Sequence, residues 1–160
     1  MRILGIDPGY ERLGIAIIEK NTTGKESYVY SECFKTSPKE PHEKRLSLIA
    51  KKIESVIEEF LPSTLAIETL FLNTNQKTAF KVSESRGVLI ERAATLGLRV
   101  FEYTPLQIKT AVTGYGRSDK NQIISMIPRL IDLPKDHKTQ DDEYDAIGVA
   151  LTCIATEKSW

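Results

Sequence analysis

Residues 3–18 read ILGIDPGYERLGIAII, two apolar segments separated by a polar turn. Pro8 fits the second position and Gly9 the third position of a type II turn, so the stretch predicts strand, tight turn and strand. A third strand is predicted at residues 28–34, after the polar turn at residues 21–24. Three strands joined in this way predict an antiparallel meander at the start of the fold.

Helices and strands are predicted to alternate along the rest of the chain. Between Pro41 and Pro62, apolar residues recur at spacings of three and four, which is typical of an amphipathic helix. Gly97 is predicted to cap a later helix. Two further strands are predicted at residues 64–68 and 98–103. Four further helices are predicted: one at residues 75–96, a short one that begins at residue 105, one that ends at about residue 131, and a last one that begins near residue 139. This order indicates an α/β fold with a mixed five-stranded sheet, an antiparallel meander plus parallel strands, flanked by helices.

Composition limits the possible function classes. The 160 residues are 41% hydrophobic, which is enough for one core, so we expect a single domain over residues 1–160. Basic and acidic residues balance at 22 each, so a nucleic acid would need a local patch, and residues 73–138 supply one with 11 basic against 6 acidic residues. Cys33 and Cys153 fit no zinc or disulfide pattern, and no segment resembles a membrane helix or a signal peptide. We therefore expect a cytoplasmic protein with no membrane partner.

Asp7 and Glu68 each stand at the end of an apolar strand, where ligands commonly bind in α/β folds. Asp7 shares a strand face with Ile3 and Gly5, and Pro8 holds its backbone extended. Each acid also has a simpler explanation, Asp7 as a cap of the turn and Glu68 as a solvated acid in the following loop. The positions alone leave both alternatives open.

An acidic segment at residues 139–145 precedes the last apolar run. Thr139 is predicted to cap this helix, and acids in a first helical turn are favoured by the helix dipole. That explanation suits Asp142 better than Asp145, which lies one turn further in. The two aspartates share a helix face, where like charges cost energy unless a cation lies between them.

Asp7, Glu68, Asp142 and Asp145 together offer an all-oxygen ligand set suited to Mg²⁺ or Mn²⁺. Two such ions, about 4 Å apart, would support hydrolysis of a phosphodiester. Sequence spacing does not establish that the four carboxylates converge.

Six motifs occur in order along nearly the whole chain. They are Ile3-Leu4-Gly5-Ile6-Asp7-Pro8-Gly9, Ala66-Ile67-Glu68, Ser85-Arg86-Gly87, Phe101-Glu102-Tyr103, Val112-Thr113-Gly114-Tyr115-Gly116 and Asp142-Glu143-Tyr144-Asp145-Ala146. This ordered set resembles the RuvC family of Holliday-junction resolving endonucleases, within the ribonuclease H-like superfamily. The resemblance implies an active enzyme in which Asp7, Glu68, Asp142 and Asp145 bind two Mg²⁺ ions, with Mn²⁺ as a substitute. The bulky pair Glu143-Tyr144 departs from the small residues associated with the family at that place.

The resemblance also implies partners. It implies a homodimer, with the helix at residues 75–96 in the dimer contact, that places paired symmetric nicks in a four-way DNA junction during recombination and repair. It further implies work beside the RuvA–RuvB branch-migration complex. Phe71 matches an aromatic residue that stacks on a base, although an isolated Phe is more often part of a core.

Basic residues extend the implied DNA contact. Lys109 and Lys120 match family lysines near the active site and are expected to act in catalysis and in DNA binding. Other predicted DNA contacts are Lys77, Lys81, Arg86, Tyr115 and Arg117. Solvated surface is the ordinary explanation for any single lysine, but clustering beside a glycine-rich loop favours contact with DNA. His42 has no predicted role.

Three other functions fit these residues less well. A ribonuclease H-like nuclease that acts on RNA, similar to YqgF, is disfavoured by Phe71 and by the two aspartates of the last helix. An ATP-binding module of the actin and sugar-kinase type normally needs two lobes, and 160 residues supply one. A junction-binding protein without catalysis is disfavoured by the complete carboxylate set.

Overall fold

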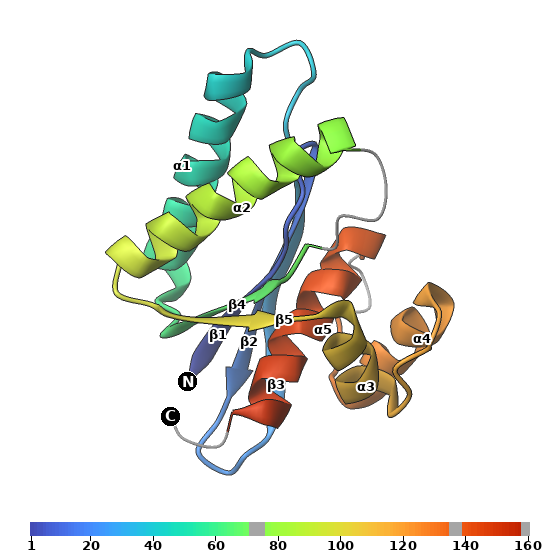
Figure 1. The fold of residues 1–160 in the computed structure, drawn as a ribbon. Coiled ribbons are helices and arrows are strands. Elements are labelled where there is room, and N and C mark those ends of the chain that lie inside the picture. Colours follow the sequence, from blue (N-terminus) through green and yellow to red (C-terminus); the bar gives the residue numbers. More distant parts are fainter. Residues whose placement is uncertain (71–75, 135–138, 158–160) are drawn as a thin grey trace.

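The computed structural model describes residues 1–70, 76–134 and 139–157, with side chains in the second range described from Ala79 onward. Five strands and five helices occur in these ranges (Figure 1). In chain order they are β1 (Arg2–Asp7), β2 (Arg12–Lys20), β3 (Glu26–Lys35), α1 (His42–Phe60), β4 (Thr64–Glu68), α2 (Gln76–Thr95), β5 (Arg99–Tyr103), α3 (Pro105–Thr113), α4 (Lys120–Leu130) and α5 (Asp141–Thr156). The predicted α/β architecture is confirmed.

The strands form one mixed sheet in the order β3-β2-β1-β4-β5. β1 pairs antiparallel with β2, and β2 pairs antiparallel with β3, which is the predicted meander. β4 pairs parallel with both β1 and β5. β1 is therefore the central strand, and residues at its carboxyl end lie beside those at the end of β4.

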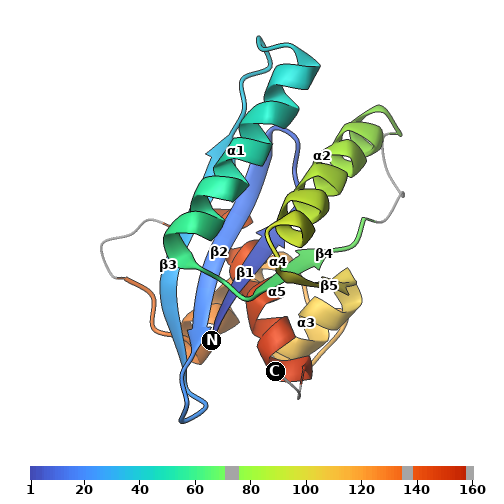
Figure 2. The same cartoon turned by 90° about the vertical axis from the view of Figure 1, so that its left-hand side faces the viewer.

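Helices cover both faces of the sheet (Figures 1 and 2). α1 and α2 cover one face, over a core that includes Leu4 and Ile6. α5 lies along the other face, with α3 and α4 packed beside it. Ile3 belongs to this second core, and α5 approaches the sheet so closely that a Cβ on Gly5 would lie 2.3 Å from the Ala146 carbonyl oxygen. Because side chains alternate along a strand, Asp7 lies on the same face as Ile3 and Gly5, which is the face that α5 covers.

Local sequence signals account for the start of α3 and the end of α2. Thr104 accepts a hydrogen bond from the Gln107 backbone at the start of α3, and Pro105 takes the first helical position. α2 ends as predicted at Gly97, whose φ of 83° is the left-handed conformation that favours glycine. The Leu98 amide then donates to the Ala93 carbonyl at 2.9 Å, which completes the cap.

Two local predictions are wrong. Gly9 does not have a positive φ, so residues 7–10 do not form a type II turn. Gly9 is needed because a Cβ there would lie 1.6 Å from the Arg12 carbonyl oxygen. Thr139 is not the cap of α5, because the helix begins one residue later, with Gln140 as its cap.

Candidate active site

The sheet register brings Asp7 and Glu68 together. Ile6 of β1 lies opposite Ile67 of β4, so the next residue of each parallel strand emerges at the same edge of the sheet. Asp7 is also opposite Gly14 of the neighbouring antiparallel strand. Two carboxylates distant in sequence therefore become neighbours through strand pairing alone.

The first turn of α5 completes the acidic cluster. A Cβ on Gly14 would lie 2.1 Å from the Asp142 carbonyl oxygen and 3.1 Å from the Asp7 Cβ, so the start of α5 packs directly over Gly14 of β2, beside Asp7. Asp145 follows one turn later and lines a cavity together with Glu68. The structure thus gathers all four predicted carboxylates at one end of the sheet.

Glu143 anchors this turn of α5 from below. Its side chain is only 2% exposed and accepts a 2.5 Å hydrogen bond from the Ser31 hydroxyl of β3. Its other carboxylate oxygen accepts a 2.9 Å hydrogen bond from the backbone amide of Gln140, the N-cap residue of α5. The residue that departs from the family pattern is therefore a buried support for the two aspartates beside it.

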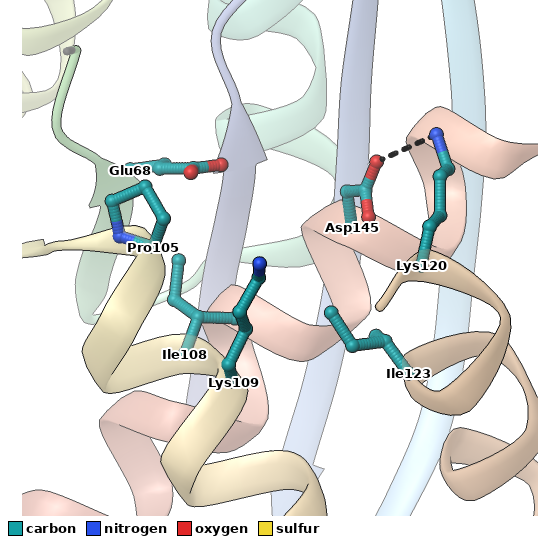
Figure 3. A pocket seen from close by; sticks show the side chains of 7 residues that line it. All are labelled: Glu68, Pro105, Ile108, Lys109, Lys120, Ile123 and Asp145. Carbon is teal, nitrogen blue, oxygen red and sulfur yellow. Dashed lines mark ion pairs between the residues drawn. The ribbon is translucent and has the colours of Figure 1, made fainter. Parts of the chain in front are cut away.

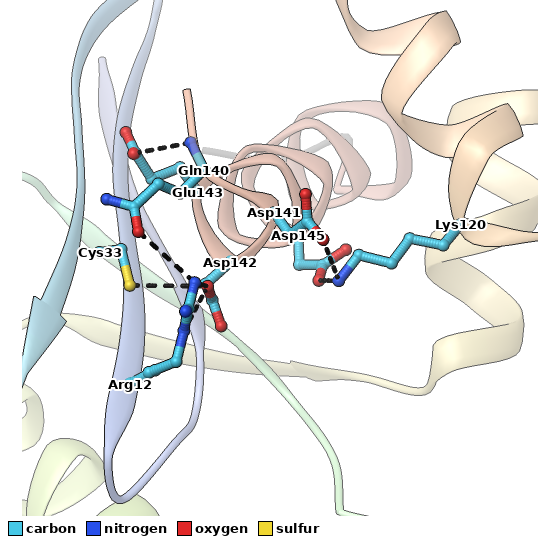
Figure 4. Close-up of polar contacts among 8 residues, drawn as sticks. All are labelled: Arg12, Cys33, Lys120, Gln140, Asp141, Asp142, Glu143 and Asp145. Carbon is cyan, nitrogen blue, oxygen red and sulfur yellow. Dashed lines mark hydrogen bonds and ion pairs between the residues drawn. The ribbon is translucent and has the colours of Figure 1, made fainter. Parts of the chain in front are cut away.

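Two cations of the protein hold the aspartates of α5 (Figure 4). Arg12 Nε donates to Asp142 Oδ2 at 3.0 Å, and the same oxygen accepts from the Cys33 thiol at 3.5 Å. Lys120 Nζ lies 3.3 Å from Asp145 Oδ2 and 3.4 Å from Asp141 Oδ2. Arg12 and Lys120 approach Asp142 and Asp145 from opposite sides of α5 (Figure 4).

A cavity of about 190 Å³ opens between β4, α3, α4 and α5 (Figure 3). Its polar lining consists of Glu68, Asp145, Lys109 and Lys120, above an apolar floor that includes Ile108. Figure 3 shows the Lys109 ammonium pointing into the space between the two carboxylates. An adjoining cavity, which shares Glu68, is lined by Asp7 and Thr69.

Burial and mutual repulsion make this cluster electrostatically costly. Burial, followed by the charges of Glu68, Asp145 and Asp142, raises the pKa of Asp7 to about 8. Burial and the charge of Asp145 raise the pKa of Glu68 to about 7. The pKa of Asp145 is also raised, by burial first, even though Lys120 opposes the shift. Burial is the largest single effect on Asp142 and acts to raise its pKa, but the hydrogen bond and charge of Arg12, together with hydrogen bonds from the backbone and Cys33, outweigh it, so the pKa of Asp142 is lowered.

These residues fit a divalent cation by chemistry and by charge. All four donors are carboxylates, and a cation between them would relieve the repulsion that raises the pKa of Asp7. The buried Thr69 hydroxyl oxygen, beside Glu68, has no hydrogen-bond partner within the described part of the chain. Among the described residues, no three potential ligands are grouped closely enough to hold one metal ion. In this arrangement Oδ2 of Asp142 is paired with Arg12, and Oδ2 of Asp145 is paired with Lys120.

The other predicted DNA contacts lie in different settings. Phe71 is outside the described residues, and Lys77 lies in α2 but its side chain is not described. Lys81 and Arg117 are exposed, and Tyr115 is 58% exposed on the loop between α3 and α4. Arg86 is only 18% exposed and pairs with Glu102, which favours a positioning role over the predicted contact with DNA.

Comparison with known proteins adds an independent observation. Residues 3–153 match the family model described as crossover junction endodeoxyribonuclease RuvC. The chain belongs to the RuvC family. The RuvC protein of Finegoldia magna is 43% identical over 161 residues, which cover 99% of this chain and 95% of that protein.

Solved RuvC structures share the fold of this RuvC-family chain. The Thermus thermophilus RuvC structure has a TM-score of 0.85 at 31% identity and covers 95% of this chain and 92% of its own. T. thermophilus RuvC in complex with a Holliday junction substrate has a TM-score of 0.87 at 30% identity, with coverages of 97% and 93%. The predicted family and fold are both confirmed.

Sequence reasoning missed three features of this RuvC-family site. Arg12 is the partner of Asp142, Ser85 and Arg86 contact the segments that carry Asp7 and Glu68, and Glu143 supports α5. The Ser85-Arg86 motif was visible in the sequence, but Arg86 was predicted to contact DNA and Ser85 had no predicted role. Arg12 had no signal beyond its place near the turn after Asp7.

Proposed function

We propose that this protein is a metal-dependent endonuclease that resolves four-way DNA junctions by paired symmetric nicks. The observation that carries the proposal is the packing of Asp7 and Glu68 against the acidic first turn of α5, beside a cavity lined by Lys109 and Lys120. RuvC-family membership supports the junction as substrate.

Each side chain of the site has a distinct task. Asp7, Glu68, Asp142 and Asp145 hold two Mg²⁺ ions, with Mn²⁺ as a substitute. When bound, these ions supply activation of a water molecule and stabilisation of the departing 3′ oxygen. Lys120 exchanges its ion pair with Asp145 for a backbone phosphate, and Lys109 adds positive charge beside the scissile bond.

DNA approaches over the basic middle of the chain. Lys81 on α2 and the loop residues Tyr115 and Arg117 expose their side chains for contact with the backbone. Phe71 stacks on a base near the junction centre, which can contribute about 1–3 kcal/mol. Lys77 contributes a further positive charge.

The decisive experiment compares cleavage of a mobile four-way junction, a linear duplex and an RNA–DNA hybrid, each with Mg²⁺ or with EDTA. Paired nicks in the junction alone, and only with Mg²⁺, are expected. Cleavage of the hybrid instead would reassign the substrate to RNA. Binding of the junction without any nick would contradict the proposed activity and indicate that the protein binds junctions without cutting them.

The proposed enzyme acts as a homodimer with α2 in the contact. One face of α2 is exposed along its length, with residues at spacings of three and four. These residues are Phe80, Glu84, Gly87, Glu91 and Ala94. Phe80 is 70% exposed, and a Cβ on Gly87 would meet nothing within 4 Å. A glycine in the middle of a helix destabilises the fold by about 0.5–1 kcal/mol relative to alanine. Close approach of a second copy of the chain, which a side chain at this position would block, explains why glycine is present.

Phe80→Glu is expected to weaken the dimer by about 10- to 100-fold, because burial of a Phe side chain contributes about 1.5–3 kcal/mol. Sedimentation velocity over a range of protein concentrations would measure the shift from dimer to monomer. Leu61→Glu is the matched control, since Leu61 is 76% exposed at the end of α1. An unchanged dimer in Phe80→Glu would move the contact away from this face.

Two further parts of the proposal concern the cell. The protein works in the cytoplasm, beside the RuvA–RuvB branch-migration complex that supplies junctions. Among the helices of the described residues, none has the length and apolar character needed to cross a bilayer.

A further inference from the structure

Ser85 of α2 holds the backbone just beyond Asp7. Its side chain is fully buried, and its hydroxyl donates a 3.0 Å hydrogen bond to the Gly9 carbonyl oxygen. A buried hydroxyl is costly unless it is hydrogen-bonded, so this contact fixes both partners. Gly9 is two residues after Asp7, and the bond therefore ties α2 to the end of β1.

Arg86, the next residue, holds the backbone of Glu68. Its Nε donates to the Glu68 carbonyl oxygen at 3.1 Å, and its terminal nitrogen pairs with Glu102 of β5. The planar guanidinium makes both contacts at once, which a single ammonium group does not reproduce. Arg86 therefore ties α2 to the end of β4.

Glu84, the residue before Ser85, makes a third link through His42. His42 Nε2 lies 3.0 Å from Glu84 Oε2, and His42 Nδ1 lies 2.7 Å from the Tyr10 hydroxyl. The Tyr10 ring also packs against Arg45, whose guanidinium carbon is 3.8 Å from the ring centroid. Consecutive residues of α2 thus contact the backbone at the ends of β1 and β4, which carry Asp7 and Glu68. His42, which had no predicted role, links Glu84 of α2 to Tyr10.

We propose that Ser85 and Arg86 are positioning residues that set the separation of the Asp7 and Glu68 carboxylates, so that the position of α2 determines metal affinity. The inference rests on the proposed function for the identity of the metal ligands. Mg²⁺ and Mn²⁺ sites demand well-defined ligand positions, and both backbone segments are held from the same helix. Because α2 also carries the proposed dimer face, dimer formation and metal binding share one element.

The test measures Mn²⁺ affinity directly, by loss of the electron paramagnetic resonance signal of free Mn²⁺ as it binds. Ser85→Ala and Arg86→Gln are each expected to weaken Mn²⁺ binding by about 10- to 100-fold, the usual effect of removing a partner that orients a metal ligand. Arg86→Lys keeps the charge near Glu102 but loses the Nε donor, so it is expected to bind Mn²⁺ as weakly as Arg86→Gln. It also keeps the proposal testable if Arg86→Gln fails to fold.

Two matched controls separate positioning from general damage. Ser83→Ala changes an exposed serine on the same helix, and Glu102→Gln removes the ion pair of Arg86 but leaves its bond to Glu68. Both controls are expected to bind Mn²⁺ like the parent protein, and circular dichroism would establish that every variant is folded.

Folded Ser85→Ala and Arg86→Lys proteins with the affinity of the parent would overturn the proposal, as would an equal loss in the controls or a parent that binds no Mn²⁺. Junction cleavage by the parent is assayed separately. If the parent cuts no junction but the variants lose Mn²⁺ affinity as described, the proposed substrate fails and the positioning role stands.

Discussion

Asp7→Asn is expected to lower the rate of junction cleavage by about 1,000-fold or more, because in the proposed function this carboxylate holds metal ions that lower the barrier by several kcal/mol. The same variant is expected to be more stable than the parent protein when no metal is present. When it folds, the metal-free parent must either place a charged Asp7 carboxylate beside Glu68, Asp145 and Asp142 or take up a proton there. The neutral amide occupies the same space without that repulsion.

The gain in stability should depend on pH in a defined direction. Asp7 has a pKa of about 8 in the folded protein and 3.8 as an unperturbed group, so the folded state binds the proton more tightly. Stability of the metal-free parent should therefore fall as the pH rises from about 4 to about 8, by up to about 5 kcal/mol in total. The stability of Asp7→Asn should depend less steeply on pH, because Asn does not titrate. The pH dependence that remains comes from Glu68, which has a pKa of about 7.

Urea unfolding at several pH values, in EDTA and in Mg²⁺, would measure these effects. Mg²⁺ should stabilise the parent more than the variant, since a ligand of the folded state raises stability by mass action. Glu58→Gln, at an exposed position on α1, is a control that should change neither rate nor pH dependence. A variant that cuts junctions normally, or one that is less stable than the parent at pH 8, would contradict the assignment of Asp7.

Lys120→Met is expected to slow single-turnover cleavage by about 100- to 1,000-fold, the usual cost of removing a donor that stabilises developing charge. Lys120 Nζ lies 3.3 Å from Asp145 and remains 50% exposed, so it can reach a phosphate at the mouth of the cavity. The ion pairs with Asp145 and Asp141 outweigh the effect of burial and raise its pKa, which keeps it charged. Junction affinity should change far less than the rate.

A competing explanation is that Lys120 only holds Asp145 in place for the metal. Mn²⁺ titration separates the two roles, because loss of a cationic competitor should leave metal affinity unchanged or increase it. Lys51→Met, an exposed lysine on α1, is the matched control. Full recovery of the rate at high Mg²⁺ concentration would argue against direct action of Lys120 on the phosphate.

Local patterns accounted for the architecture to a large extent. The apolar runs around Asp7, the helical spacing between Pro41 and Pro62 and the glycine after α2 each report on neighbours within a few residues. They failed at the turn after Asp7, because the need for glycine there comes from contact with the Arg12 carbonyl and not from a positive φ.

The sequence by itself determined the order and type of the elements, the ends of β1 and β4 as places for acids, and the shared helix face of Asp142 and Asp145. Only the tertiary structure decided that Arg12 and Lys120 hold those aspartates, that Glu143 is buried against Ser31, and that Ser85 and Arg86 grip the backbone beside Asp7 and Glu68. Hydrogen-bond partners separated by many residues, 76 for Ser85 and Gly9, leave no periodic trace in the sequence. They depend on how helices pack against the sheet, which is a property of the whole fold.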